Sequence, residues 1–239
     1  MLKLHLGCGK CFIPGFVHVD IVDAPHIDFR SSVDNLCDFS DGSVDLIYAS
    51  HVLEHFGRYE VEAVLKGWYR VLAPGGVLRI AVPDFAAVVA LYEQEGLRDG
   101  QSGLVGSICG GQRNQYDFHK VIFDEPFLGY LLRKVGFGDI RRWDWRSTEH
   151  ASIDDFSQAY LPHMDKEHGR LMSLNLEAVK PARNKSRQPV EISTLSQGLG
   201  AQTPKAARVR PAPGLQPNRW SDAQSRDDYH HYAARRAGG

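Results

Sequence analysis

Residues 2–20 read LKLHLGCGKCFIPGFVHVD, and this stretch decides which fold the chain can adopt. A first apolar run, 2–6, is broken by Gly7, Cys8 and Gly9, and a second run, 16–21, carries Asp20 near its end. In an α/β protein this pattern predicts a strand, a tight glycine turn and a second strand whose carboxylate can bind ribose hydroxyls. Because ligands of such sheets bind beyond the carboxyl ends of the strands, we expect the two glycines and Asp20 to lie together there.

The rest of the chain continues this alternation of strands and helices. Further strands are predicted by short apolar runs at 26–29, 44–49, 77–82, 139–145 and 171–179. Helices are predicted by helical spacing and by stop signals at 59–72, 85–94, 125–135 and 153–161. The stretch 95–124 shows no pattern and is either a functional insertion or wrongly assigned. This order predicts a mostly parallel sheet covered on both faces, with the last two strands antiparallel.

The composition changes near Pro181. Residues 182–239 are rich in Pro, Gly, Ser, Gln, Ala and Arg and poor in aliphatic residues, so we predict a disordered tail after a single domain, 1–181. The tail holds 10 Lys and Arg against 4 Asp and Glu, whereas the domain holds 18 against 25. A basic arm of this kind can touch nucleic acid or an anionic membrane surface. Its charges are dispersed, so a solvated segment without a nucleic-acid partner is favoured.

Apolar runs in this chain are too short for a membrane span, which needs about 18 apolar residues. The chain starts directly with a predicted strand and shows no signal-peptide pattern, so a cytoplasmic location is expected. The cysteines are too few and too scattered for a disulfide framework in a chain of this length. They are Cys8, Cys11, Cys37 and Cys109.

The glycine turn by itself does not decide which cofactor is bound. A sheet that holds a pyrophosphate needs a third glycine and a full helix whose N-terminus faces the phosphates. Here Lys10, Cys11 and Pro14 follow the turn, and only about ten residues separate the two predicted strands. A dinucleotide is therefore disfavoured, whereas a cofactor with a ribose and no phosphate, such as S-adenosylmethionine (SAM), fits the pattern.

Four segments in their order and spacing resemble the class I SAM-dependent methyltransferases: LHLGCG, HVD, DGSVDLIYASHVLEHF and VLAPGGVLRIAVPD. Within that class the chain resembles a small bacterial branch often linked to surface-polysaccharide synthesis, whose members also show an H-K-x-x-F segment and a late SLNLEAVKP strand. The resemblance covers 1–181 and leaves the tail out. It implies a Rossmann-like, doubly wound fold with a seven-stranded sheet and a reversed last strand.

The resemblance also implies how SAM would be bound. The turn at Gly7, Cys8 and Gly9 would approach the methionine part, and Asp20 would hold the ribose hydroxyls. Other binding residues would frame adenine or line the methyl end. These are Asp34, Asn35 and Leu36 around the adenine, and Ser50 and His51 at the methyl end. Many relatives place an aspartate where this chain has Ser32, so the contact to the adenine amine can come from either position.

Methyl transfer needs an acceptor atom held in line with the sulfonium methyl group, and positioning supplies most of the acceleration. A base is needed only when the nucleophile is protonated at neutral pH. Our candidate base is His119, with Asp117 placed to orient its ring. The alternative is that His119 is a surface histidine in a loop. The resemblance implies O-methylation of a sugar or other small-molecule hydroxyl, with a small molecule or glycan precursor as acceptor.

Two motifs would fit metal sites, yet no metal is expected. His51, Glu54 and His55 match the H-x-x-E-H pattern of inverted zinc peptidases, which requires a helix and a further ligand. We expect Glu54 to cap the helix that follows and His55 to pack. The C-x-x-C pair at Cys8 and Cys11 would need a second pair of cysteines to bind zinc, so packing in the turn is favoured.

Two other classes of function stay open at this point. The fold could bind SAM without transferring its methyl group and act as an interaction partner through the basic tail. Alternatively, the chain could be a nicotinamide-dependent sugar-nucleotide enzyme, although this requires the glycine and the helix that the turn lacks.

Overall fold

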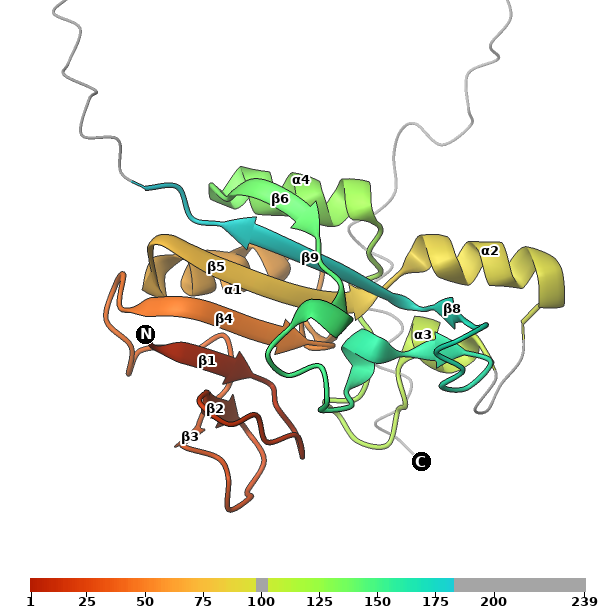
Figure 1. The fold of residues 1–239 in the computed structure, drawn as a ribbon, viewed down its shortest axis with the longest axis horizontal. Helices are drawn as coiled ribbons and strands as arrows, with labels where there is room; N and C mark the ends of the chain where they lie inside the picture. Colours follow the sequence, from red (N-terminus) through yellow and green to blue (C-terminus); the bar gives the residue numbers. More distant parts are fainter. Residues whose placement is uncertain (98–102, 183–239) are drawn as a thin grey trace, which may run out of the picture. The chain divides into compact units, whose positions relative to one another are not determined.

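A single mixed sheet forms the centre of the protein (Figure 1). The computed structural model describes residues 1–97 and 103–182. Seven strands lie in the order β3-β2-β1-β4-β5-β9-β6, and β9 pairs antiparallel with both of its neighbours. The bounds are β1 Lys3–Leu6, β2 Val17–Asp20, β3 Phe29–Arg30, β4 Val44–Ser50, β5 Leu72–Pro83, β6 Gly138–Arg142 and β9 Ser173–Val179. The predicted fold class, with its reversed last strand, is confirmed.

Three helices follow the predicted positions closely. They are α1 (Val61–Val71), α2 (Phe85–Glu95) and α4 (Glu125–Val135). Asp84 caps α2 by accepting a hydrogen bond from the Ala86 amide at 3.0 Å, as expected for an N-cap residue. At the C-terminal end of α4, Gly136 takes a left-handed conformation, and its amide donates hydrogen bonds to carbonyls of the last turn.

The two faces of the sheet are covered in different ways. On one face α1 and α4 pack over alternating residues of the central strands, and Trp68 of α1 is fully buried there. The other face is covered by non-helical segments, whose Ile13, Phe16, Trp143 and Ile153 pack on Tyr48 of β4. Loops can replace helices on this face because the crossover from β1 to β2 is too short for a regular helix.

Several predicted boundaries are wrong in detail. The edge strand lies at Phe29–Arg30, later than the predicted 26–29. Residues 72–76 belong to β5, where the register with β4 shifts and Gly75 and Gly76 exchange hydrogen bonds with Lys180. A Cβ at Gly76 would lie 2.8 Å from the Ala73 carbonyl oxygen, so this bulge requires glycine.

The largest differences occur in the segments outside the repeating pattern. The helix predicted at 153–161 is absent: a single 3₁₀ turn, Phe156–Gln158, precedes β7 (Tyr160–Leu161), which pairs with β8 (Arg170–Leu171). The Asp155 carboxylate caps that turn, and Pro162 cannot continue a helix. The strand predicted at 139–145 ends at Arg142 and is followed by a 3₁₀ turn, Trp145–Ser147. Within 95–124 a short helix, α3 (Val105–Cys109), was not predicted.

Three of the elements that follow β5 gather beyond the carboxyl ends of the parallel strands. In Figure 1, α2, α3 and β8 lie on the side toward which the arrowheads of β4 and β5 point. A small cluster joins them, in which Val88 and Leu91 of α2 pack with Leu104, Leu161 and Met172. The insertion and the segment before β9 therefore build the walls at the edge of the sheet where a ligand is expected.

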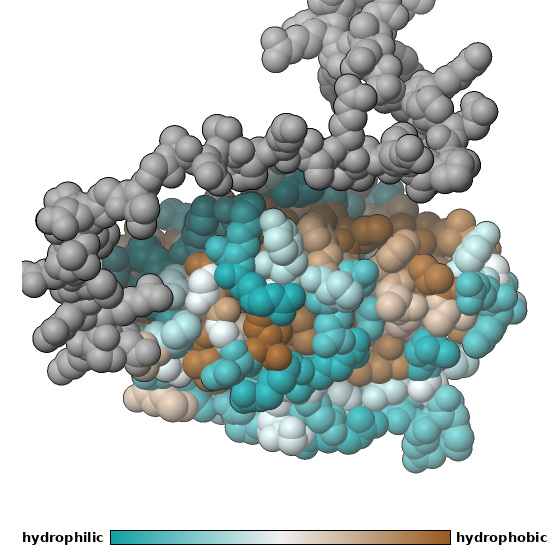
Figure 2. Space-filling view, turned by 90° about the horizontal axis from the view of Figure 1, so that it is seen from above, coloured by the Kyte–Doolittle hydropathy of each residue, from teal (hydrophilic) through white to brown (hydrophobic). Residues whose placement is uncertain are grey.

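The surface shows both hydrophilic and hydrophobic areas. Figure 2 shows hydrophobic residues on the side of the molecule that carries α2, where Val89 is 39% exposed. Within the two described ranges, the helices lack the length and hydrophobicity that a membrane span requires. The predicted disordered tail, 182–239, lies outside the described residues apart from Ala182, so the domain boundary stays a prediction.

Candidate active site

The glycine turn after β1 has the geometry that close approach to a ligand requires. Gly7 and Gly9 have φ values of +64° and +55°, a region that side-chain-bearing residues rarely adopt. A Cβ at Gly7 would lie 2.4 Å from a methyl group of Val52, so that glycine is needed for packing. A Cβ at Gly9 would meet nothing within 4 Å, so the backbone there faces open space. The turn therefore leaves room for a cofactor at Gly9.

Asp20 at the end of β2 fixes this turn. Its two carboxylate oxygens accept hydrogen bonds from the amides of Gly9 at 2.7 Å and Val22 at 3.0 Å, and the residue is 6% exposed. Each oxygen keeps a second lone pair, because a carboxylate offers about four acceptor positions. Asp20 can thus orient the turn and still accept from the two hydroxyl groups of a ribose.

Asp20→Ala is expected to weaken the binding of S-adenosylhomocysteine by about 1–3 kcal/mol, because the ribose hydroxyls and the turn lose a buried acceptor. Isothermal calorimetry measures this affinity. Asp23→Ala serves as the matched control, since Asp23 lies three residues later and its side chain is 83% exposed in a surface pair with Arg30. Equal affinities in the two variants would remove Asp20 from the cofactor site.

The cysteines of the C-x-x-C pair take part in the turn as packing residues. Cys8 is buried, and its carbonyl accepts a hydrogen bond from the Cys11 amide at 2.9 Å. Burial is the largest factor that raises the pKa of the Cys8 thiol, to about 12, and it also raises the pKa of Cys11. Thiols that stay protonated are poor nucleophiles and poor metal ligands, in agreement with the predicted packing role.

The predicted adenine segment is only partly available to a ligand. Leu36 is 3% exposed and belongs to the main core, and its carbonyl accepts from Arg70 at 2.7 Å. Asp34 and Asn35 are exposed, and the Asp34 carboxylate accepts a hydrogen bond from the Ser32 hydroxyl. The two alternative positions for an adenine contact, 32 and 34, are therefore hydrogen-bonded to each other. Leu36 anchors this segment in the core.

The end of β4 places Ser50 and His51 next to the reversed strand β9. His51 has a φ of +54°, and its Nε2 lies 3.1 Å from the Ser173 hydroxyl. That hydroxyl donates to Asn175 Oδ1, whose amide group in turn donates to the Ser157 carbonyl. Because the Ser173 proton is already used, His51 Nε2 is the donor in its contact with Ser173. The chain of polar groups thus fixes the His51 ring.

Glu54 is a carboxylate buried beside three histidines. It lies in a 3₁₀ turn, Leu53–His55, and its side chain is 1% exposed. Its Oε1 is 3.3 Å from His51 Nδ1 and 3.9 Å from His119 Nε2. Burial raises the pKa of Glu54, but contacts with His51, His55 and His119 lower it further, so the net shift is downward. The predicted role as cap of the following helix is wrong, because Glu54 turns toward the histidines and α1 begins without a side-chain cap.

His119 lies near this carboxylate and at the wall of a cavity. Its Nδ1 bonds to the Ser107 carbonyl at 3.0 Å, so Nδ1 carries the proton and Nε2 is left with a lone pair. Burial lowers the pKa of His119, which favours the neutral ring, although the Glu54 charge opposes this. The ring is oriented by Ser107 and not by Asp117, whose carboxylate accepts from Arg113 Nε at 2.6 Å. Asp117 lines the same cavity from a neighbouring position.

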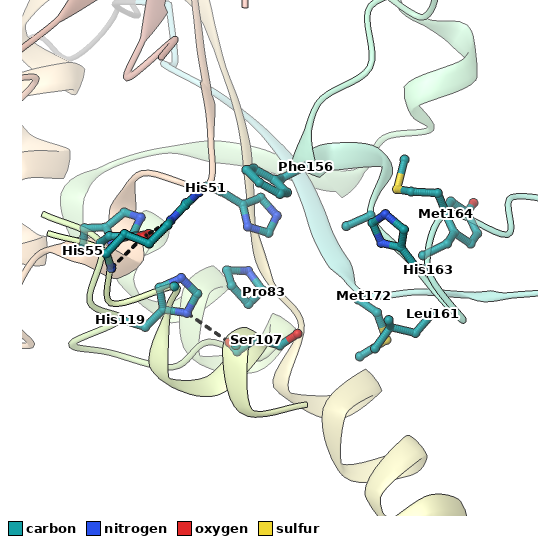
Figure 3. Close-up of a pocket in the computed structure, with 16 residues that line it drawn as sticks. His51, His55, Pro83, Ser107, His119, Phe156, Leu161, His163, Met164 and Met172 are labelled. Carbon is teal, nitrogen blue, oxygen red and sulfur yellow. Dashed lines mark hydrogen bonds and ion pairs between the residues drawn. The ribbon is translucent and has the colours of Figure 1, made fainter. Parts of the chain in front are cut away.

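The cavity that His119 faces has a volume of about 300 Å³. In Figure 3, His51, His55 and His119 lie at one end of it, and Leu161, His163, Met164 and Met172 at the other. Phe156 and Tyr160 add aromatic surface, and Gly106, Ser107 and Gly111 of the insertion complete the wall. A volume of this size suits a small molecule.

Some residues of the site could not be found by inspection of the sequence. Ser107 bonds to His119, and Ser173 bonds to His51, from segments far away in the sequence. No local motif indicates these contacts. Glu54 was visible within H-x-x-E-H, but its partner His119 lies 65 positions later, so only the fold brings the two together.

Comparison with known protein families identifies one domain in the first half of the chain. Residues 17–80 match the family model described as a methyltransferase domain, Methyltransf_11. The match covers about a quarter of the chain and identifies a methyltransferase domain there. The open space at Gly9 and the free acceptor positions of Asp20 fit the backbone and ribose of SAM.

Solved structures of similar shape include several methyltransferases. The 1,6-didemethyltoxoflavin-N1-methyltransferase of Burkholderia thailandensis, solved with S-adenosylhomocysteine, is 18% identical and has a TM-score of 0.45, over 75% of this chain and 71% of that chain. A SAM-dependent methyltransferase of Thermotoga maritima, described as a possible histamine N-methyltransferase, is 14% identical with a TM-score of 0.47, over 75% and 82%. No curated protein matches the sequence.

Proposed function

We propose that this methyltransferase transfers the methyl group of SAM to a hydroxyl oxygen of a small molecule, and that the acceptor is a sugar or a sugar-containing precursor of a surface polysaccharide or a secondary metabolite. The observation that carries this proposal is the cavity of about 300 Å³, lined by His51 and His119, at the end of the sheet where the cofactor turn lies. A cavity of this volume admits one small ring system and excludes a folded macromolecule.

The cofactor takes the place that the glycine turn leaves free. The backbone at Gly7, Cys8 and Gly9 approaches its methionine part, and Asp20 accepts from its ribose. Asp34 and Asn35 border the adenine, with Leu36 as their buried support. Ser50 and His51 line the methyl end, and His51 also lines the cavity, so the sulfonium methyl group would point at the acceptor. This placement supplies the in-line geometry on which methyl transfer depends.

His119 acts on the acceptor hydroxyl at the far side of the methyl group. Its Nε2 lone pair faces the cavity wall because Nδ1 is tied to Ser107. As the oxygen forms a bond to the methyl carbon, the C–S bond breaks and its electrons stay on sulfur, which gives S-adenosylhomocysteine. The hydroxyl proton leaves with the help of His119 and passes to solvent. Asp117 contributes at the cavity wall through its pair with Arg113.

A sugar fits the character of the lining. Phe156 and Tyr160 offer flat apolar surface for the face of a ring, and polar groups of Ser107, Asp117 and His163 stand around it. A mainly apolar pocket with a few placed polar groups is the usual composition of a small-molecule site. The sequence resemblance to the polysaccharide-linked branch supports the same acceptor class.

Methyl transfer from labelled SAM to a panel of monosaccharides, nucleotide sugars and lipid-linked glycan precursors tests this proposal. We expect label in one class of sugar hydroxyl, located by mass spectrometry of fragments. Label found only on nitrogen acceptors, or on proteins and nucleic acids, would contradict it. If S-adenosylhomocysteine forms without any labelled acceptor, SAM is being hydrolysed and its methyl group is not transferred to a sugar.

A further inference from the structure

We propose that Glu54, His55 and His119 form a binding site for one Zn²⁺ ion at the wall of the acceptor cavity. One possible ligand atom from each residue lies within 4.8 Å of those from the other two. The inference rests on the proposed function, since it concerns how the same cavity activates the acceptor hydroxyl.

The orientation of the two imidazole rings is the first support. His55 Nδ1 donates to the Phe118 carbonyl at 3.1 Å, and His119 Nδ1 donates to the Ser107 carbonyl at 3.0 Å. Both rings are thus held as the tautomer whose Nε2 carries a lone pair. Histidines that bind metals commonly donate their other ring N–H to a backbone carbonyl in this way, which fixes the ring and raises its basicity.

The buried carboxylate is the second support. Neither oxygen of Glu54 receives a hydrogen bond of normal geometry from the described residues, although the side chain is only 1% exposed. The lone pair of His119 Nε2 lies 3.9 Å from Glu54 Oε1. Acceptor atoms turned toward one another at such distances repel unless a cation stands between them. His51 Nδ1, at 3.3 Å from Glu54 Oε1, is the ring nitrogen nearest to this carboxylate.

The set of ligands points to zinc. Two imidazoles and one carboxylate form a three-ligand set that leaves a further position open, as in catalytic zinc sites. Zinc also brings no redox chemistry to a methyl transfer. Because His55 and His119 both line the cavity, the open position faces the place of the acceptor. With the ion bound, His119 Nε2 would be a zinc ligand and the ion would take over the activation of the hydroxyl. A hydroxyl oxygen bound at the open position would lose its proton to water more readily, and its lone pair would then form the bond to the methyl carbon.

The sequence pattern alone did not predict this site, because H-x-x-E-H in inverted zinc peptidases places both histidines on one helix. In this protein the segment after β4 forms only a 3₁₀ turn, and the Nε2 of His51 is engaged by Ser173. His119 from the insertion takes the place of the second ligand.

Metal binding by the full-length protein tests the inference without relying on turnover. After treatment with a chelator, the protein is titrated with Zn²⁺ by calorimetry and with Co²⁺ by visible absorption. We expect one specific ion per chain, and an affinity lower by more than about tenfold in Glu54→Gln, His55→Ala and His119→Ala. His168→Ala is the matched control, since its side chain is 82% exposed and lies outside the cavity lining. Retained binding of S-adenosylhomocysteine shows that each variant is folded.

The outcomes separate the metal site from the proposed function. Equal metal affinity in the three variants and the control would overturn the site. Full turnover of a protein shown to be free of metal would also overturn it, while leaving O-methylation intact. Specific Zn²⁺ binding that depends on the three residues, together with no transfer to any hydroxyl acceptor, would support the site and contradict the proposed function.

Discussion

His119→Ala is expected to lower kcat by about a hundredfold or more, because the acceptor hydroxyl then loses the group that helps to remove its proton. Steady-state kinetics with the acceptor identified by labelled SAM measures this loss. The affinity for S-adenosylhomocysteine should stay close to that of the original protein, since His119 lies at the acceptor cavity and away from the glycine turn.

A matched control for this variant is His168→Ala, which removes an imidazole from the exposed segment before β8. Its kcat should be unchanged. If His119→Ala turns over as fast as this control, positioning alone is sufficient for the reaction and His119 is a structural residue. A parallel loss of cofactor affinity would indicate a damaged fold and not a missing catalytic group.

Acidification from pH 7 to pH 5 is expected to destabilise the protein strongly, because three histidines lie on the loop-covered face of the sheet. His5 is 2% exposed, and burial lowers its pKa to about 3, with His18 and His150 adding to the shift. Burial also lowers the pKa of His18 and His150, although the Asp28 charge opposes the shift at His18 and the Asp155 charge opposes it at His150. The His5 ring therefore stays neutral in the folded protein over this pH range, and the same direction of shift at His18 and His150 adds to the effect.

The direction of the effect follows from proton linkage. Below the unfolded pKa of about 6.5, the unfolded chain binds protons that the folded protein does not, so stability falls as pH falls. His5 alone accounts for a loss of about 2 kcal/mol in the free energy of unfolding between pH 6.5 and pH 5. Most carboxylates titrate at lower pH, so the change in stability between pH 7 and pH 5 arises mainly from histidines.

Urea denaturation at several pH values measures this dependence. His5→Phe removes the titrating group and keeps an aromatic ring beside Phe16 and Tyr48. The slope of the unfolding free energy against pH should then decrease by about one proton. His168→Ala should keep the original slope. An unchanged slope in His5→Phe would show that His5 does not titrate on unfolding in this range.

The regular part of the fold could be predicted because its signals are local. The apolar runs of β1, β4 and β5 and the helical spacing of α1 and α4 appear in consecutive residues, and Asp84 and Gly136 mark helix ends. The reversed β9 followed from the resemblance, whereas the link before it is long and contains the β7–β8 pair. Local propensity and the requirements of the fold agree in these segments.

The segments that build the cavity could not be predicted to the same extent. The turn at 156–158, the β7–β8 pair and α3 are held by contacts with residues far away in the sequence. The same holds for the site: Gly7, Gly9 and Asp20 come together as predicted, whereas the orientation of His119 by Ser107 and its approach to Glu54 depend on the insertion. Long-range contacts of this kind leave no periodic signal in the sequence.

Calorimetric titration with S-adenosylhomocysteine tests the central claim most directly, because it requires neither the acceptor nor a metal. We expect one site per chain with a dissociation constant in the micromolar to low millimolar range, about −4 to −8 kcal/mol, and weaker binding for Asp20→Ala than for Asp23→Ala. Absence of heat and of any thermal shift at saturating S-adenosylhomocysteine would contradict the assignment of the glycine turn to SAM.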